Sequence, residues 1–326
     1  MFTTGTATHH NDLLDKLRIW LTGTAGWTQL AWTAGATVND SSVLAIRGPG
    51  AGAGKQVYIN IRTKATSATS LYTWEMSGAT DYIGSQPWGA QPNEGPAPYL
   101  NLWQNSIDYW FYANDRRFVV VAKMSTVYAS CYCGFYLPWG TPAQVPFPLF
   151  IGGNRSIEVI YNDNNSATRF FVDPGGESSG PSAGAWCRHP DGTWKPVINQ
   201  SVSNSVDNCF GRSEASHMVV WPWSPSNSNS TSTSFLNLGG STSGQSTGGT
   251  LDQLVPTAQG ERTVVPVELR CRGASNSPAG VLDGVFCPFG RGLVTEQTIT
   301  VSAKLMRAFQ NQQRNKGNSI MLIEEV

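Results

Sequence analysis

The feature that most constrains the fold is the stretch from Leu100 to Leu137, which reads as consecutive β-strands joined by tight turns. Arg117 to Met124 alternates between two sets of side chains, and this period of two, with β-branched and aromatic residues, is typical of a half-buried strand. Turns are expected at 113–116, because Asn and Asp accept left-handed backbone angles at low cost, and at 125–126. The stretch therefore predicts an antiparallel meander with strands at 107–112, 117–124 and 128–137.

Further short strands separated by turn signals are expected along most of the chain. They fall at 27–33, 43–47, 56–62, 71–77, 157–161, 168–172, 263–272, 281–286, 296–301, 304–310 and 319–324. This spacing predicts a mainly β fold, an antiparallel β-sandwich or barrel-like core with a short N-terminal amphipathic helix and long loop excursions. Four regions follow: an N-terminal arm and helix at 1–25, an antiparallel β core at 26–176, an extended loop-rich excursion at 177–260, and C-terminal strands returning to the β core at 261–326.

Residues 11–22 predict the early helix. Thr8 or Asn11 can cap it, and Gly23 can end it. Its apolar face, which includes Leu13, Leu17 and Trp20, must dock on the chain's own sheet or on a neighbouring subunit. The pair His9–His10 at its start is expected to be exposed to solvent.

The charge of the chain is low and balanced. Charged residues make up 13% of the sequence and the formal net charge is +0. A nucleic-acid-binding protein would carry a surplus of basic residues, so this function is disfavoured. Because low net charge favours association, much of the surface is expected to be covered by other subunits.

No apolar run approaches the roughly 18 to 20 residues of a membrane span, so no span is predicted. The first residues lack the basic head and apolar core of a signal peptide, and synthesis in a cytoplasm is the expectation. The six cysteines are then expected to be thiols rather than bridges.

Four motifs are candidates for binding or catalytic chemistry, and none of them is assigned as a site. The glycine-rich loop 48–55 has Pro49 and Gln56 where a phosphate-binding loop needs Gly and Ser or Thr, so a hairpin tip is predicted. Cys131 and Cys133 share one strand face, which suits packing better than a zinc site built with Cys187 and His189. A serine–histidine triad is recognised by geometry, and the sequence around His217 does not supply it. A glycosidase needs paired carboxylates, and the acids in or beside the aromatic region that could supply them are Asp81, Asp108, Glu158, Asp163 and Asp173.

Two loop regions are candidates for contacts. The Pro- and Gly-rich loop 84–98 carries Trp88 at its middle, a candidate anchor for a partner or a sugar ring. Residues 224–249 contain no charged residue, and Phe235 and Leu236 can pin this segment in place. Trp139, Trp186 and Trp194 are further candidates for stacking on sugars.

Several motifs together resemble virion structural proteins of long-tailed bacteriophages and prophages. They are HNDLLDKLRIWLT, RGPGAGAGKQVYINI, LNLWQNSIDYWFYANDRRFVVVAKMS, FVDPGG, CPFGRGLVTEQTIT and the terminal IMLIEE. The resemblance spans most of the chain and implies a particle component of the tail, its baseplate or tip, or the neck. It carries over no functional residue.

The sequence therefore predicts a non-enzymatic virion component, made in the bacterial host cytoplasm, that assembles as a symmetric ring or sleeve. Its expected partners are copies of itself and other virion proteins, with no cofactor, metal or nucleic acid. The candidate interface residues are Leu13, Leu17, Trp20, Trp88, Trp139, Trp186, Trp194, Phe235 and Leu236. One alternative is a host-receptor or glycan-binding tail protein, with a host surface glycan as partner. A second is a glycan-degrading hydrolase.

Overall fold

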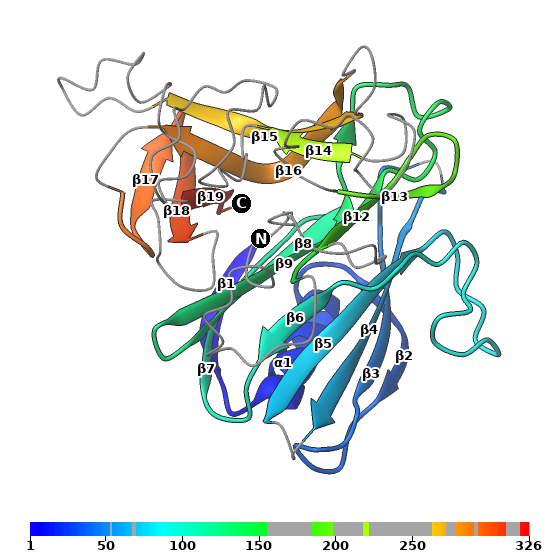
Figure 1. Cartoon of the computed structure of the whole chain (residues 1–326), viewed down its shortest axis with the longest axis vertical. Helices are drawn as coiled ribbons and strands as arrows, with labels where there is room; N and C mark the ends of the chain where they lie inside the picture. Colours follow the sequence, from blue (N-terminus) through cyan, green and yellow to red (C-terminus); the bar gives the residue numbers. More distant parts are fainter. Residues whose placement is uncertain are drawn as a thin grey trace, which may run out of the picture.

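The structure, a computed structural model, confirms the predicted fold class: it is mainly β, with antiparallel sheets and one short helix near the N-terminus (Figure 1). It describes residues 1–52, 54–66, 70–154, 184–197, 218–221, 263–271, 278–289, 293–310 and 320–325. The predicted hairpin at 157–172 and the island at Phe235 and Leu236 lie outside the described residues.

The predicted meander forms the middle of a seven-stranded sheet, here called the central sheet. Its strand order is β1 (Phe2–Ala7), β7 (Ile107–Ala113), β8 (Arg117–Met124), β9 (Val127–Phe135), β11 (Leu149–Gly152), β12 (Ala185–Arg188) and β13 (Trp194–Pro196). The turn between β7 and β8 is closed by Asn114, whose Oδ1 accepts from the backbone N–H groups of Arg116 and Arg117 at 2.9 and 3.1 Å. The strand pairings and both turns of the meander are confirmed.

A second sheet, the β2–β6 sheet, has five strands in sequence order. They are β2 (Thr28–Thr33), β3 (Val43–Gly48), β4 (Val57–Thr66), β5 (Leu71–Ala79) and β6 (Tyr99–Leu102). The glycine-rich loop is the β3–β4 hairpin tip, as predicted, and Gly50 N donates to Asp115 O of the meander turn at 2.7 Å.

The C-terminal strands form a third sheet of their own, here called the C-terminal sheet. Its order is β14 (Met218–Trp221), β15 (Thr263–Cys271), β16 (Pro278–Phe289), β19 (Ile320–Glu324), β18 (Lys304–Gln310) and β17 (Thr298–Val301), with β10 (Leu137–Pro138) pairing to β16. In the region 177–260, where a loop-rich excursion is expected, the described segments 184–197 and 218–221 contain the strands β12, β13 and β14.

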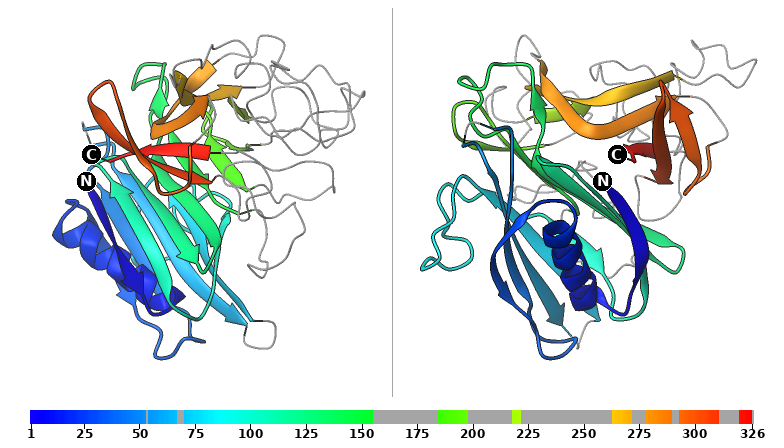
Figure 2. Two further views of the ribbon diagram at one scale, coloured as in Figure 1. Left: turned by 90° about the vertical axis from the view of Figure 1, so that its left-hand side faces the viewer. Right: turned by 180° about the vertical axis from the view of Figure 1, so that it is seen from behind.

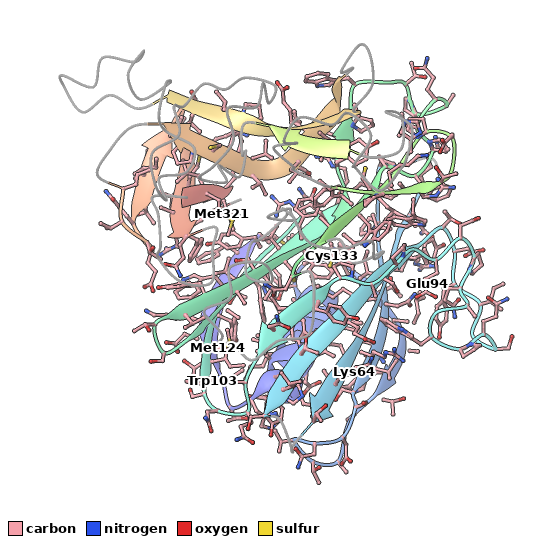
Figure 3. All side chains as sticks on the ribbon, in the orientation of Figure 1. Lys64, Glu94, Trp103, Met124, Cys133 and Met321 are labelled. Atoms are coloured by element: carbon pink, nitrogen blue, oxygen red, sulfur yellow. The ribbon has the colours of Figure 1, made fainter. Side chains whose placement is uncertain are left out.

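The central sheet is covered on both faces, so the expectation of a half-buried strand at 117–124 is wrong. Val119 and Val120 point to opposite faces of β8, and both are 0% exposed. On one face Cys133 Sγ lies 3.8 Å from Met76 Sδ of the β2–β6 sheet. On the other face the ring centroid of Trp110 lies 5.2 Å from that of Phe309 in the C-terminal sheet. Figure 3 marks Cys133 in the central sheet and Met321 in the C-terminal sheet above it.

Helix α1 (His10–Gly23) packs over β1 and β7 beside the β2–β6 sheet, as Figure 2 shows from behind. His9 caps it rather than Thr8 or Asn11, because the Nδ1 atom of His9 accepts from Asp12 N at 3.3 Å. Asn11 instead turns inward and donates to Thr37 O and Asp40 O, each at 3.0 Å.

His10 is fully buried, which corrects the expectation that both histidines are exposed. It lies one turn before Leu13 and Leu14 on the apolar face of α1, so it enters the core with them. Neither ring nitrogen has a hydrogen-bond partner, and the ring stands 5.1 Å from that of Tyr72. Burial, with a smaller contribution from His9, lowers the pKa of His10 from 6.5 to about 3.

A polar cluster joins the central sheet to the C-terminal sheet. This Asp283 joint consists of Asn114, Arg116, Arg117, Tyr132 and Asp283. The Oδ2 atom of Asp283 accepts from Asn114 Nδ2 at 2.8 Å and from Arg116 Nε at 3.2 Å. Arg117 is 1% exposed and donates from Nε to Asp283 O at 2.9 Å. Buried polar groups of this kind hold their surroundings in one arrangement, since a group that loses its partner pays its full desolvation cost.

Gly284 fits tightly against this joint. Its φ is +69°, and a Cβ placed there would come within 2.0 Å of Arg117 Nη2. Gly284→Ala is therefore expected to lower the free energy of unfolding by more than the ~1–2 kcal/mol that a left-handed backbone alone costs. Gly26→Ala is the matched control, because Gly26 has a φ of +75° and nothing within 4 Å. Urea denaturation of the two variants compares them, and equal losses would contradict a steric role for Arg117.

Candidate assembly surfaces

The apolar face of α1 docks within its own chain. Leu13 and Leu17 are both 0% exposed in the core, so they have no surface left for a neighbouring subunit. Trp20 is half-buried, with its ring centroid 5.8 Å from that of Phe111 on β7. Of the three helix candidates, Trp20 alone keeps an accessible part.

The loop with Trp88 is held on the β2–β6 sheet by its own polar side chains. Glu94 accepts from Asn60 Nδ2 at 3.2 Å and from Gln91 N at 2.9 Å, and Ser77 Oγ also donates to it. Trp88 is half-buried, and the Arg62 guanidinium carbon stands 5.0 Å from its ring centroid. One side of this ring is therefore already used by a cation–π contact.

Trp194 and Trp186 have structural contacts. Trp194 Nε1 donates to Asn93 O at 2.9 Å, and its ring lies so close to Gly95 that a Cβ there would come within 2.4 Å. Trp186, on β12, is 7% exposed. Trp194 on β13 therefore packs against the loop that carries Trp88, whereas Trp186 is part of the interior.

Trp139 is the most accessible tryptophan among the candidates, at 55% exposure. It directly follows β10, and its backbone N–H donates to Ala279 O at 3.0 Å. The backbone is therefore fixed to the C-terminal sheet while the ring projects outward. Its position is apart from the loop that carries Trp88.

The residues weighed for chemistry are dispersed. Cys131, Cys133, Cys187 and Cys287 are buried free thiols, as expected for these four. Asp81 follows β5 and accepts from its neighbour Tyr82 N at 2.8 Å, while Asp108 on β7 accepts from Thr6 Oγ1 at 2.8 Å. The other three weighed acids, at 158, 163 and 173, lie outside the described residues. Across the described ranges, no three metal-ligating side chains come together, and no helix is long and apolar enough to cross a membrane.

Strand β1 gives the surface that sequence patterning missed. It is the first strand of the central sheet, and only β7 pairs with it among the described residues. Ala113 N donates to Met1 O at 2.9 Å, and Met1 N donates to Ala113 O at 2.7 Å, so these two residues form a hydrogen-bonded pair. Such pairs alternate along an antiparallel ladder, so residues 3, 5 and 7 bond β7 and the backbone groups of Phe2, Thr4 and Thr6 point outward. These outward groups are here called the β1 edge.

The β1 edge lacks the features that usually protect a free strand. Its sequence, FTTGTA, has no charge and no proline, and its pairing with β7 has no bulge. Two other sheet edges do carry such features: β13 contains Lys195 and Pro196, and β2 has a register shift between Gln29 and Ala31. Three threonines within six residues were the available sequence signal, since threonine favours strands.

Gly5 keeps this strand against β7. A Cβ at Gly5 would come within 2.6 Å of the Tyr109 hydroxyl, so the ring of Tyr109 lies across the strand at this residue. Tyr109 stacks in turn on Phe111, with ring centroids 4.1 Å apart. The side of β1 that faces α1 is thus closed by packing, and its outer edge is left open.

No family model matches the chain, and no curated protein matches it.

Proposed function

We propose that the chain is a structural protein of a tailed-bacteriophage virion, assembling as a symmetric ring or sleeve in the tail, baseplate or neck. The resemblance of six motifs to virion structural proteins of long-tailed phages supports this assignment. The low and balanced charge supports it as well, because a net charge near zero favours association. Its partners in this role are copies of itself and other virion proteins.

The observation that carries the proposal is the open β1 edge. A strand whose outward N–H and C=O groups lack charge, proline or bulge protection is a template for pairing with another chain. Strand β17 is another uncharged edge, with the sequence TITV and alternately exposed side chains. A protein that worked as an isolated monomer would gain nothing from leaving such edges open.

The test is the protein content of purified particles. Virions from the phage or induced prophage that encodes the chain are purified by density gradient, and the chain is quantified by mass spectrometry against the major capsid protein. We expect a fixed, multiple copy number per particle, with antibody labelling at the tail or neck in electron microscopy. Expression in lysates together with absence from particles would overturn the proposal.

A second candidate, glycan binding during host recognition, is favoured by the exposure of Trp139. Indole rings that project from a fixed backbone stack on apolar sugar faces. If this is the function, Trp139→Ala abolishes binding of the purified protein to host cells while leaving its thermal midpoint unchanged. A Trp20→Ala chain, which also loses a partly accessible indole, serves as the comparison and should still bind.

A further inference from the structure

We infer that two copies of this chain join through their β1 edges, antiparallel and centred on Thr4, so that their central sheets become one continuous sheet. The inference rests on the proposed function in taking a second copy as the partner. It goes further by naming the contact, the register and the symmetry.

The hydrogen-bonding phase of β1 defines what the edge can accept. Met1 and Ala113 exchange two backbone N–H···O bonds, so the backbone groups that face away from β7 belong to Phe2, Thr4 and Thr6. Among the described residues, no backbone bond is formed by these outward groups. The side chains of Thr4 and Thr6 are exposed, so none of the described residues covers them against an approaching strand.

A two-fold axis beside Thr4 gives every outward backbone group of the β1 edge a hydrogen-bond partner. In an antiparallel pair centred there, Thr4 lies opposite the partner's Thr4, and Phe2 lies opposite the partner's Thr6. Each outward N–H and C=O group of either strand then has a partner. A pairing shifted along the strand leaves groups at both ends unbonded, and such groups are costly when covered.

The side chains agree with this register. Thr4, Phe2 and Thr6 lie on the same face of β1, the face turned toward the C-terminal sheet, because they are opposite Trp110, Tyr112 and Asp108. Threonine directly opposite threonine is a favourable cross-strand pair. The two-fold axis therefore places threonine against threonine at the centre.

Charge complementarity supports a second copy as the occupant. The guanidinium carbon of Arg307 lies 5.5 Å from the ring centroid of Phe2, at one end of the edge. Asp108 lies at the other end, bonded to Thr6 Oγ1 at 2.8 Å. Antiparallel pairing brings the basic end of each copy beside the acidic end of the other, although Arg307 also holds Glu325 at 2.5 Å within its own chain.

Helix α1 leaves the edge accessible. It packs against the face of β1 and β7, where Trp20 meets Phe111, and does not hydrogen-bond the strand's outer side. In Figure 2, β1 lies at the margin of its sheet beside α1. A two-fold contact is isologous and by itself closes a pair of chains, so the ring of the proposed function needs a second, head-to-tail contact elsewhere on the chain.

The test is the solution mass of the full-length protein by light scattering and native mass spectrometry. Thr4→Pro removes the outward N–H and keeps the backbone bonds between β1 and β7, although it also removes the bond from Thr4 Oγ1 to Tyr109 O. It is expected to halve the mass of the wild-type assembly. Thr300→Pro places the same residue in the uncharged edge strand β17 and should leave the β1 pair in place. Circular dichroism and the thermal midpoint verify that both variants are folded.

A charge-swap experiment tests the register even if the proline variant misfolds. The Thr4→Lys and Thr4→Glu chains each place like charges opposite one another. Each pair should therefore dissociate at a protein concentration at least about tenfold higher than the wild-type pair does. Mixed in equal amounts, they should form a one-to-one pair, because only a two-fold axis at this residue sets position 4 against itself. Wild-type protein that is monomeric at high concentration, or swapped chains that do not pair, would overturn the inference. A chain that pairs but is absent from virions would overturn only the proposed function.

Discussion

Asp283→Ala is expected to lower the free energy of unfolding by about 1–3 kcal/mol, the cost of removing a largely buried acceptor from its hydrogen-bond partners. The Asp283 carboxylate accepts from Asn114 at 2.8 Å and lies 3.1 Å from Arg116 Nη2. The bond from Arg117 Nε goes to the backbone oxygen of Asp283, so the substitution keeps it. The loss therefore comes from the two partners of the carboxylate, Asn114 and Arg116. Urea denaturation, with an unchanged slope against denaturant, measures the loss.

Arg117→Met supplies the matched control for this prediction. It replaces a buried guanidinium, whose two terminal nitrogens have no hydrogen-bond partner, by an apolar side chain of similar length. We expect its free energy of unfolding to stay within about 1 kcal/mol of wild type, because the desolvation cost removed with these nitrogens offsets the lost bond from Nε. In the Arg117→Met background, Asp283→Ala should cost the same as it does alone within about 0.5 kcal/mol, because Arg117 bonds the backbone oxygen of Asp283 and not its carboxylate. A coupling energy above about 1 kcal/mol would contradict this assignment.

Stability is expected to fall between pH 6.5 and pH 3 because His10 must stay neutral in the core. The pKa of His10 is lowered to about 3 in the folded chain. Between pH 6.5 and pH 3 the ring is therefore protonated in the unfolded chain and neutral in the folded chain. The stabilisation from the neutral ring is therefore complete above pH 6.5 and is lost as the pH falls toward 3. At pH 5 this difference corresponds to about 2 kcal/mol, and near pH 3 to about 4 kcal/mol.

The comparison with His10→Leu isolates this contribution. Other groups also lose stabilisation in acid: although burial alone would raise it, hydrogen bonds from Thr193 lower the pKa of Asp191 to about 2. The measured quantity is therefore the difference in unfolding free energy between wild type and His10→Leu across this pH range. The groups near the ring are Tyr72 and His9, with centroids 5.1 and 6.1 Å away, and neither brings a negative charge. A difference that does not change with pH would contradict the burial of a neutral imidazole.

The sequence predicted the parts of the fold whose signals are local. Alternation and Asn114 located the meander, and β-branched runs located both strands of the glycine-tipped hairpin. The layers were not predictable in the same way, because period two in β8 is the same whether one face or both are covered. Only the placement of the C-terminal sheet decides that Val119 is buried along with Val120.

The candidate surfaces were predictable to a smaller extent. Leu13 and Leu17 carry the same pattern whether a helix docks on its own chain or on another, and the structure resolves this in favour of the chain's own core. Tryptophans at Pro- and Gly-rich loops mark contacts, yet Trp194 is held by Asn93 and Gly95 within the chain. The β1 edge could not be predicted from the sequence, because whether a strand lies at a sheet edge depends on which strands pair with it. Strand β1 pairs with β7, about a hundred residues further along the chain.

The covering of the central sheet by strands from the end of the chain has a consequence during synthesis. Trp110, Tyr112 and Tyr128 are translated long before Phe309, whose ring packs against them. While the ribosome is still adding the intervening two hundred or so residues, the nascent meander presents an aromatic surface to the cytosol. Transcripts truncated ahead of β15 would thus yield insoluble products that chaperones must hold, even though every strand of the meander is already made.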